Sequence, residues 1–265
     1  MQPFYRFEHF SKNRSLIHAV SKKEIGEAYA FSLALHTGEA KENIIANRKR
    51  LVEVLSAGNL TVFVTANQTH SDHIAVLDKK EMRGWDSLDD AVEDCDALIT
   101  DQVGVILTIL TADCVPVLLY DPLKRVVAAV HAGWKGTEAE IVSKTIERMS
   151  ERFSSNPSDI LAGIAPAIGK CCYEVGEDVA SHFFDHPDTM ERCGEKYMLD
   201  LPMINKKQMM ASGLLEEHIE MSGICTACEV EQYFSYRKEQ GCSGRFMSMI
   251  GMGEQSFSTT PQRYQ

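Results

Sequence analysis

The sequence lacks any apolar run long enough to cross a membrane. No window approaches the roughly 20 apolar residues that a transmembrane helix needs, although 44% of the 265 residues are hydrophobic. The opening residues, MQPFYRFEHFSKNRS, hold no apolar stretch followed by a small-residue cleavage site, so they do not resemble a secretory signal. We therefore expect a cytoplasmic protein that does not associate with membranes.

Positive charge is also scarce. The chain has 27 Lys and Arg against 38 Asp and Glu, a formal net charge of -11. Because an acidic surface repels the phosphate backbone, nucleic-acid binding is not expected. A few local Arg and Lys residues can still hold a small anionic substrate. The familiar phosphate loops, GxGxxG after a strand and GxxxxGKS or GxxxxGKT, are absent from the sequence.

Internal repeats, low-complexity tracts and Pro- or Gly-rich linkers are absent as well. A chain of 265 residues is long enough to bury a large core. We therefore predict one continuous α/β body over residues 1–265, with a flexible tail after about residue 254. The sequence leaves the oligomeric state open.

Three strongly apolar runs dominate the centre of the chain, at 103–112, 115–120 and 125–131. Such runs predict strands that are covered on both faces, and the short turn between the last two favours antiparallel pairing. Strands are also predicted at 60–66, 160–166, 219–225 and 245–251, and residues 80–98 are predicted to form a loop with a helical turn.

Helices are predicted over fewer segments. Apolar residues at helical spacing mark 41–57, with Gly58 as the stop, and Thr137 with Glu140 reads as a capping box for a following helix. Shorter helices are expected at 177–184 and 202–213. Because strands outnumber long helices, a mixed-sheet α+β fold is favoured over a doubly wound one.

The eight cysteines, without a secretory signal, indicate reduced thiols. Cys171 and Cys172 are adjacent in the sequence. Cys225 and Cys228 form a CxxC motif, a pattern typical of redox sites and of structural zinc sites. There is no second CxxC, and this one does not open a helix after a strand as a thioredoxin motif does. We interpret these residues as ordinary buried thiols.

Three other residues stand where a predicted strand gives way to an irregular segment. His70 follows the first strand, Cys114 lies in TADCVP, and His131 ends the third apolar run. Strand ends are where rigid scaffolds present chemistry. Zinc accepts imidazole nitrogen and thiolate sulfur together, and three protein ligands leave one position open, as in catalytic sites. Spacing alone does not select this trio over ordinary core residues.

Several motifs carry a family resemblance. The segments NQTH, TADCVPVLLYD, VVAAVHAGWKGT, GIAPAIGKCCYEVG, QYFSYRK and SGRFMSMIG together resemble the family historically labelled polyphenol oxidase or multicopper laccase-domain, now regarded as zinc-dependent purine nucleoside phosphorylases with adenosine deaminase side activity. The matches run in order from about residue 31 to 252, and TADCVP followed by HAGWKG is very specific.

The resemblance implies the fold, the metal and the substrates. It implies a four-layer α/β/β/α sandwich with mixed β-sheets, and one catalytic zinc ion on His70, Cys114 and His131. The implied reaction is phosphorolysis of purine nucleosides by inorganic phosphate to free base and ribose-1-phosphate, with adenosine deaminase and methylthioadenosine phosphorylase activity. The preferred nucleoside stays open.

Phosphorolysis requires a group that holds phosphate and a group that handles protons. Arg48, Lys135 and Arg245 are the candidates for phosphate, because guanidinium and ammonium groups bind oxyanions. Asp113, beside the cysteine ligand, is the candidate to orient a ligand or carry a proton, and it could equally cap a turn. Each of the cations could also be a solvated surface residue.

Three other functions stay open. Copper oxidation is disfavoured because the nine histidines include no His-x-His pair of the kind that builds a trinuclear copper cluster. A cysteine hydrolase would use Cys114 as nucleophile and His131 or His70 as base. A non-enzymatic scaffold would use zinc for structure alone.

Overall fold

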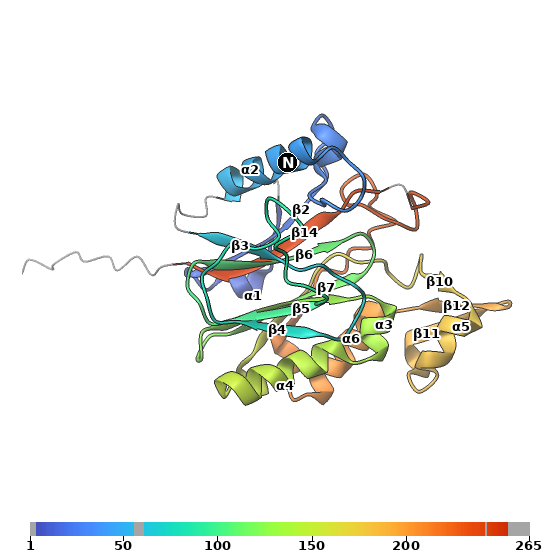
Figure 1. Ribbon diagram of the computed structural model, residues 1–265. Coiled ribbons are helices and arrows are strands. Elements are labelled where there is room, and N and C mark those ends of the chain that lie inside the picture. The colour runs from blue at the N-terminus through green and yellow to red at the C-terminus, as the bar shows by residue number, and fades with distance from the viewer. Residues whose placement is uncertain (1–3, 56–60, 242, 254–265) are drawn as a thin grey trace, which may run out of the picture.

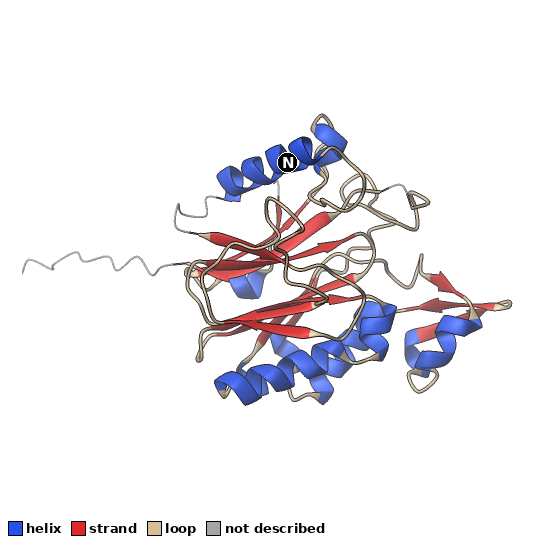
Figure 2. Cartoon of the chain, in the orientation of Figure 1, coloured by secondary structure: helices blue, strands red, loops and turns tan. Residues whose placement is uncertain are grey.

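Two β-sheets lie face to face in the computed structural model, and helices cover both outer faces (Figures 1 and 2). The structure describes residues 4–55, 61–241 and 243–253. The layers follow one another as helix, sheet, sheet and helix, which confirms the predicted α+β sandwich with mixed sheets. The predicted tail after residue 254 lies outside the described residues, as does Gly58.

Each of the two large sheets is mixed. The five-stranded sheet is antiparallel except between β3 and β6, and its order is β1 (Phe4–Tyr5), β2 (Leu16–Ser21), β14 (Phe246–Met252), β6 (Val105–Thr111) and β3 (Val62–Thr65). The six-stranded sheet has parallel pairs at both ends. Its order is β13 (Ile219–Met221), β9 (Leu161–Ile164), β7 (Val115–Asp121), β8 (Val126–Ala132), β5 (Ala97–Thr100) and β4 (Ile74–Leu77).

Helix α2 (Lys41–Leu55) covers the five-stranded sheet, while α4 (Ile141–Phe153) and α6 (Leu201–Ala211) cover the six-stranded one (Figure 1). A third, small sheet lies to one side, in the order β10 (Glu174–Val175), β12 (Lys196–Leu199) and β11 (Met190–Cys193). The remaining short helices are α1 (Glu8–Ser11), α3 (Trp134–Glu138) and α5 (Glu177–Ala180), with 3-10 turns at Ala28–Phe31, Pro157–Asp159, Ser181–Phe183, Pro187–Thr189 and Glu216–His218.

The central strands are continuously apolar because both of their faces are buried. In β7, Val117 and Leu119 pack toward α4 and α6, whereas Leu118 and Tyr120 pack toward the other sheet. This alternation follows the two-residue period of a strand. The apolar runs therefore predicted the middle of the sandwich correctly, and the antiparallel β7–β8 pairing is confirmed.

Two local predictions were wrong. Thr137 lies inside α3 and not at a cap, and α4 begins after Glu140, whose backbone is left-handed (φ 57°) and whose side chain makes no capping hydrogen bond. The loop predicted over 80–98 ends two residues early, because β5 begins at Ala97. Within this loop the Ala91 N–H donates to the Leu88 carbonyl at 3.1 Å, which forms a single turn and no helix. Four-residue strands such as β4 and β5 are too short to show a clear period.

No helix among the described residues combines the length and the apolarity that a bilayer-spanning segment requires.

Candidate metal centre

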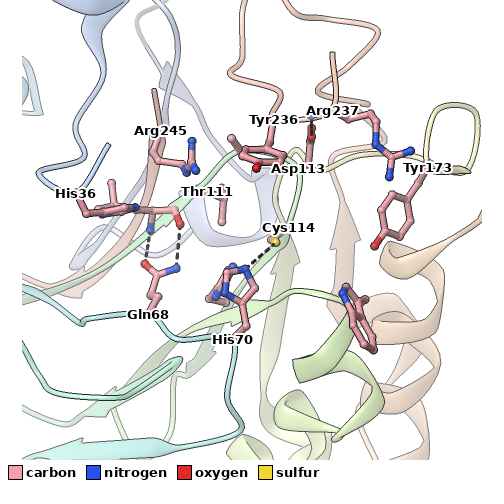
Figure 3. Close-up of a pocket in the computed structure, with 14 residues that line it drawn as sticks. His36, Gln68, His70, Thr111, Asp113, Cys114, Tyr173, Tyr236, Arg237 and Arg245 are labelled. Carbon is pink, nitrogen blue, oxygen red and sulfur yellow. Dashed lines mark hydrogen bonds between the residues drawn. The ribbon is translucent and has the colours of Figure 1, made fainter. Parts of the chain in front are cut away.

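The fold brings together the three residues that the sequence singled out. His70 follows β3 and Cys114 lies between β6 and β7 (Figure 3), and His131 is in β8. Their ligand atoms all lie within 4.8 Å of one another, and Cys114 Sγ is 3.8 Å from His70 Nε2. Imidazole nitrogen and thiolate sulfur are both zinc donors, so this group fits the ion that the resemblance implies.

Cys114 is aimed at the histidines by the strained link between the two sheets. This link, from Thr111 to Val115, takes the chain from β6 in one sheet to β7 in the other. Asp113 within it has a positive φ of 87°. Its two carboxylate oxygens accept hydrogen bonds from Thr226 Oγ1 at 2.6 Å and the Arg237 backbone N–H at 2.7 Å. The carboxylate therefore braces the link, which offsets the cost of that backbone conformation.

Gly133 makes room for the centre directly after His131. A Cβ added at Gly133 would lie 3.0 Å from His70 Cδ2 and 3.1 Å from Cys114 Sγ. The glycine of the HAGW motif therefore lets the backbone approach two of the three donors closely.

Asp96, directly before β5, holds two residues of the centre in place through hydrogen bonds. Its carboxylate accepts a hydrogen bond from His131 Nδ1 at 2.7 Å and from the backbone N–H groups of His70 at 3.1 Å and Ser71 at 2.7 Å. Burial would raise the pKa of Asp96, but the hydrogen bonds from His131 and Ser71 outweigh it and hold that pKa well below its usual range. The Nδ1 bond leaves Nε2 of His131 free to bind an ion.

Cys114 and His131 form a coupled acid–base pair. Burial opposes charge on both, yet the positive charge of His131 lowers the pKa of Cys114 to about 6. The negative charge of Cys114 and the hydrogen bond to Asp96 raise the pKa of His131 to about 9. A sulfur that is already a thiolate at neutral pH is ready for a metal, and binding would displace the imidazole proton.

We expect this pair to give Cys114 an acid-shifted reactivity in metal-free protein. Because the thiolate is the reactive form, alkylation by iodoacetamide should slow only as the pH falls through about 6, whereas an ordinary thiol has its midpoint near about 8.5. Peptide mapping after timed alkylation at several pH values measures this, with the exposed Cys193 as the internal reference. A midpoint for Cys114 equal to that of Cys193 would contradict the pairing.

The three donors open onto a cavity of about 500 Å³, a size typical of small-molecule sites. Arg245 and Tyr173 lie on either side of Cys114 in Figure 3. Aromatic side chains and two arginines share the wall; the lining residues are His36, Gln68, His70, Leu110, Thr111, Ala112, Asp113, Cys114, His131, Trp134, Tyr173, Tyr236, Arg237 and Arg245. The cavity therefore combines flat apolar surface with anion-binding groups.

Of the three predicted phosphate ligands, only Arg245 reaches this cavity. The phosphate role of Arg48 was wrong, because its side chain is completely buried elsewhere. Its guanidinium donates to the carbonyls of Leu33 at 2.9 Å and Gly84 at 2.8 Å and lies over the Trp85 ring. Arg48 thus joins α2 to two loops through backbone oxygens.

Lys135 is exposed on α3, with its ammonium 5.6 Å from the centroid of the Trp134 ring, and it does not line the cavity. Arg237, which the sequence did not suggest, lines it instead. Its guanidinium lies over the Tyr173 ring and donates to the Glu174 carbonyl at 2.7 Å. The motif QYFSYRK places both Tyr236 and Arg237 and was the available signal.

The stacked mixed sheets and the His70, Cys114 and His131 group define a four-layer α+β protein with a candidate metal centre where the chain crosses between sheets. Residues 16–253 match the family described as multi-copper polyphenol oxidoreductase laccase. The chain belongs to this family, as the motifs indicated.

Relatives extend over most of the chain. It is 34% identical over 231 residues to purine nucleoside phosphorylase YlmD of Bacillus subtilis, covering 85% of this chain and 83% of that protein. It is 34% identical over 209 residues to adenosine deaminase RL5 of an unknown prokaryotic organism, covering 76% and 79%. The crystal structure of YlmD from Geobacillus stearothermophilus superposes with a TM-score of 0.88 at 30% identity, covering 96% of this chain and all of that one.

Proposed function

We propose that the protein is a zinc-dependent purine nucleoside phosphorylase that also deaminates adenosine. The observation that carries the proposal is that a cysteine thiol, two imidazoles and Arg245 line the same cavity. The names of the relatives, purine nucleoside phosphorylase and adenosine deaminase, support both activities. Methylthioadenosine is proposed as a further substrate of the same site.

Zinc bound by three protein donors has one open coordination position, at which it supplies Lewis-acid polarisation or an activated water. His70, Cys114 and His131 are the residues that would hold it. Asp96 accepts the hydrogen bond from Nδ1 of His131, which would leave Nε2 to bind the ion, and Asp96 does not itself line the cavity.

The cavity walls would orient the two parts of the substrate. The rings of Trp134, Tyr173 and Tyr236 offer flat apolar surface for a purine base. Arg245 would hold the phosphate nucleophile. Its Nη1 already donates to the carbonyls of Ser243 at 2.7 Å and Gly244 at 2.9 Å, which fixes the guanidinium in place. A fixed guanidinium positions an oxyanion with little further loss of entropy.

Purified protein should release free base and ribose-1-phosphate from adenosine, inosine, guanosine or methylthioadenosine only when phosphate is present. Chromatography of base and sugar phosphate, with and without phosphate, measures this directly. Conversion of adenosine to inosine should proceed without phosphate, because its nucleophile is water. Absence of turnover for all four nucleosides by zinc-loaded protein would overturn the proposal.

An Arg245→Gln variant separates the two activities within one active site. It should lose phosphorolysis by about tenfold or more, the usual effect of removing a charge-assisted hydrogen bond, while retaining deamination of adenosine. Lys135→Gln, an exposed cation outside the cavity, is the matched control and should leave both rates unchanged. Equal loss of both activities in Arg245→Gln would show that Arg245 does not act on phosphate.

A cysteine hydrolase is the second candidate, and one observation favours it. Cys114 Sγ lies within 4.8 Å of His131, and Nδ1 of that histidine donates to Asp96 at 2.7 Å. This order is also the arrangement of a thiolate nucleophile, a base and an orienting carboxylate. A chelator should leave such a hydrolase active while alkylation inactivates it. The zinc proposal requires that chelation itself removes activity and that added zinc restores it.

A further inference from the structure

Four cysteines form a second cluster outside the candidate metal centre. Cys171 and Cys172 lie in the loop between β9 and β10, and Cys225 and Cys228 follow β13. Their Sγ atoms all lie within 4.8 Å of one another. The interpretation of these residues as ordinary buried thiols was wrong, because Cys171 and Cys228 are exposed and none of the four is fully buried.

The parallel pairing of β9 with β13 explains why the two cysteine pairs meet. Ile164 and Met221 are partners at the ends of these two parallel strands. The segments that follow the two strands therefore leave the sheet at the same end. Beyond the strands, the Ala167 N–H donates to the Ile224 carbonyl at 3.3 Å and the Thr226 N–H donates to the Ala167 carbonyl at 3.0 Å. The backbone thus holds the two loops side by side, independently of any bond between sulfurs.

The distances fit a single ion. In a tetrahedral site with zinc–sulfur bonds of about 2.3 Å, the sulfurs lie about 3.8 Å apart. Cys228 Sγ is 3.6 Å from Cys171 Sγ and 3.5 Å from Cys172 Sγ. A disulfide needs a separation near about 2.0 Å, and the seven described cysteines, which include these four, are all free.

The backbone around Cys225 is arranged for a thiolate. The Gly169 N–H donates to Cys225 Sγ at 3.3 Å. A Cβ at position 169 would lie 3.3 Å from Cys225 Cβ and 3.4 Å from Cys171 Sγ, so glycine allows the close approach. Hydrogen bonds from N–H groups to the ligand sulfur are the usual second layer of a metal site.

We propose that Cys171, Cys172, Cys225 and Cys228 bind one structural zinc ion. Four cysteine ligands fill all four tetrahedral positions, which is the closed arrangement of structural sites and leaves no position for a substrate. Soft thiolates alone select zinc over calcium or magnesium, which require oxygen donors. This proposal does not depend on the proposed function, because the cluster lies outside the cavity.

The ion would fasten the wall of the cavity. Cys172 directly precedes Tyr173, and the segment that begins at Cys225 continues to Tyr236 and Arg237, all three of which line the cavity (Figure 3). Thr226, inside the CxxC motif, donates to Asp113 in the link that positions the other metal ligands. The structural ion would therefore join the two loops on which the substrate wall depends.

Metal analysis of protein expressed with zinc and purified without chelator tests the proposal. Wild type should hold two zinc ions per chain, and Cys114→Ala should retain one. Cys225→Ser and Cys228→Ser should each lose one ion and melt at a lower temperature than wild type. Cys193→Ser changes an exposed cysteine outside the cluster and is the matched control, with two ions retained.

Cobalt substitution identifies the ligands even where a cysteine variant does not fold. Cobalt-loaded Cys114→Ala protein should show intense thiolate-to-cobalt charge transfer and the visible bands of a tetrahedral all-sulfur site.

One zinc per wild-type chain that disappears in Cys114→Ala would overturn the proposal. So would alkylation and mass spectrometry that find the four thiols disulfide-bonded, or free to react in metal-replete protein. Two ions without nucleoside turnover would support this proposal while rejecting the proposed function.

Discussion

Replacing Cys114 by alanine is expected to abolish nucleoside turnover and to remove one zinc equivalent. The sulfur is the only anionic donor among the three, and its charge also sustains the proton on His131. Two imidazoles alone would hold zinc weakly, and turnover should fall on the order of a thousandfold or more, the scale of losing a metal that stabilises charge. Steady-state kinetics and metal analysis of the same preparation measure both effects.

Alanine at Cys193 is the matched control, because that thiol is exposed on β11 and belongs neither to the three donors nor to the cavity lining. Circular dichroism and the melting temperature verify that Cys114→Ala remains folded. Full turnover by Cys114→Ala with one zinc fewer would show that the centre does not act in catalysis. Lost turnover with unchanged zinc content would favour the cysteine nucleophile instead.

The apolar runs predicted the layers of the fold well. Residues 105–111, 115–121 and 126–132 are buried over their whole length, and only a strand between two covered faces needs such a composition. Short edge and side strands carried no such signal. β1, β11 and β12 went unpredicted because they are two to four residues long and β11 is largely exposed. β2 was missed for another reason: it lies inside its sheet and is mostly buried, but its buried residues include the polar His18 and Ser21.

The candidate centre was predictable because its donors stand at strand ends and in motifs that the family shares. Asp96 was missed since it lies in the acidic segment EDCDALIT, where nothing local distinguishes a buried carboxylate from the exposed ones beside it. The cysteine cluster was missed for a related reason. Cys172 and Cys228 are 56 residues apart, and only the parallel β9–β13 pairing brings them together.

Arg48 shows the opposite error. Its motif NRKRL suggested a solvated or phosphate-binding cation, yet the side chain is completely buried, with its guanidinium donating to backbone carbonyls. A sequence marks the charge of an arginine and says nothing of which carbonyls the fold will present to it. Burial of this kind is a property of tertiary structure, because the partners come from residues 33, 84 and 85.

Asp96→Asn is expected to weaken zinc binding at the centre by about 10- to 100-fold, the usual effect of removing a carboxylate behind a metal-bound histidine. An amide offers one acceptor oxygen where the carboxylate offers two. Its NH₂ group would then face donors such as the Ser71 N–H, which lies 2.7 Å from Oδ2. Competition with a chelating dye measures the affinity, and rescue of turnover by excess zinc distinguishes a positioning role from a catalytic one.

The same substitution should also cost folding stability, by roughly 2–4 kcal/mol at neutral pH, because it removes a buried charge-assisted network. The pKa of Asp96 is held below its usual range in the folded protein, so its contribution is present above the unfolded pKa and disappears as the pH falls through the folded one. Wild type and Asp96→Asn should therefore differ most near neutral pH and converge in strong acid.

Asp94→Asn is the control, since that exposed carboxylate pairs only with exposed groups such as His73, at 3.0 Å. Zinc affinity in Asp96→Asn equal to that of Asp94→Asn would mean that His131 is held for the ion by packing alone.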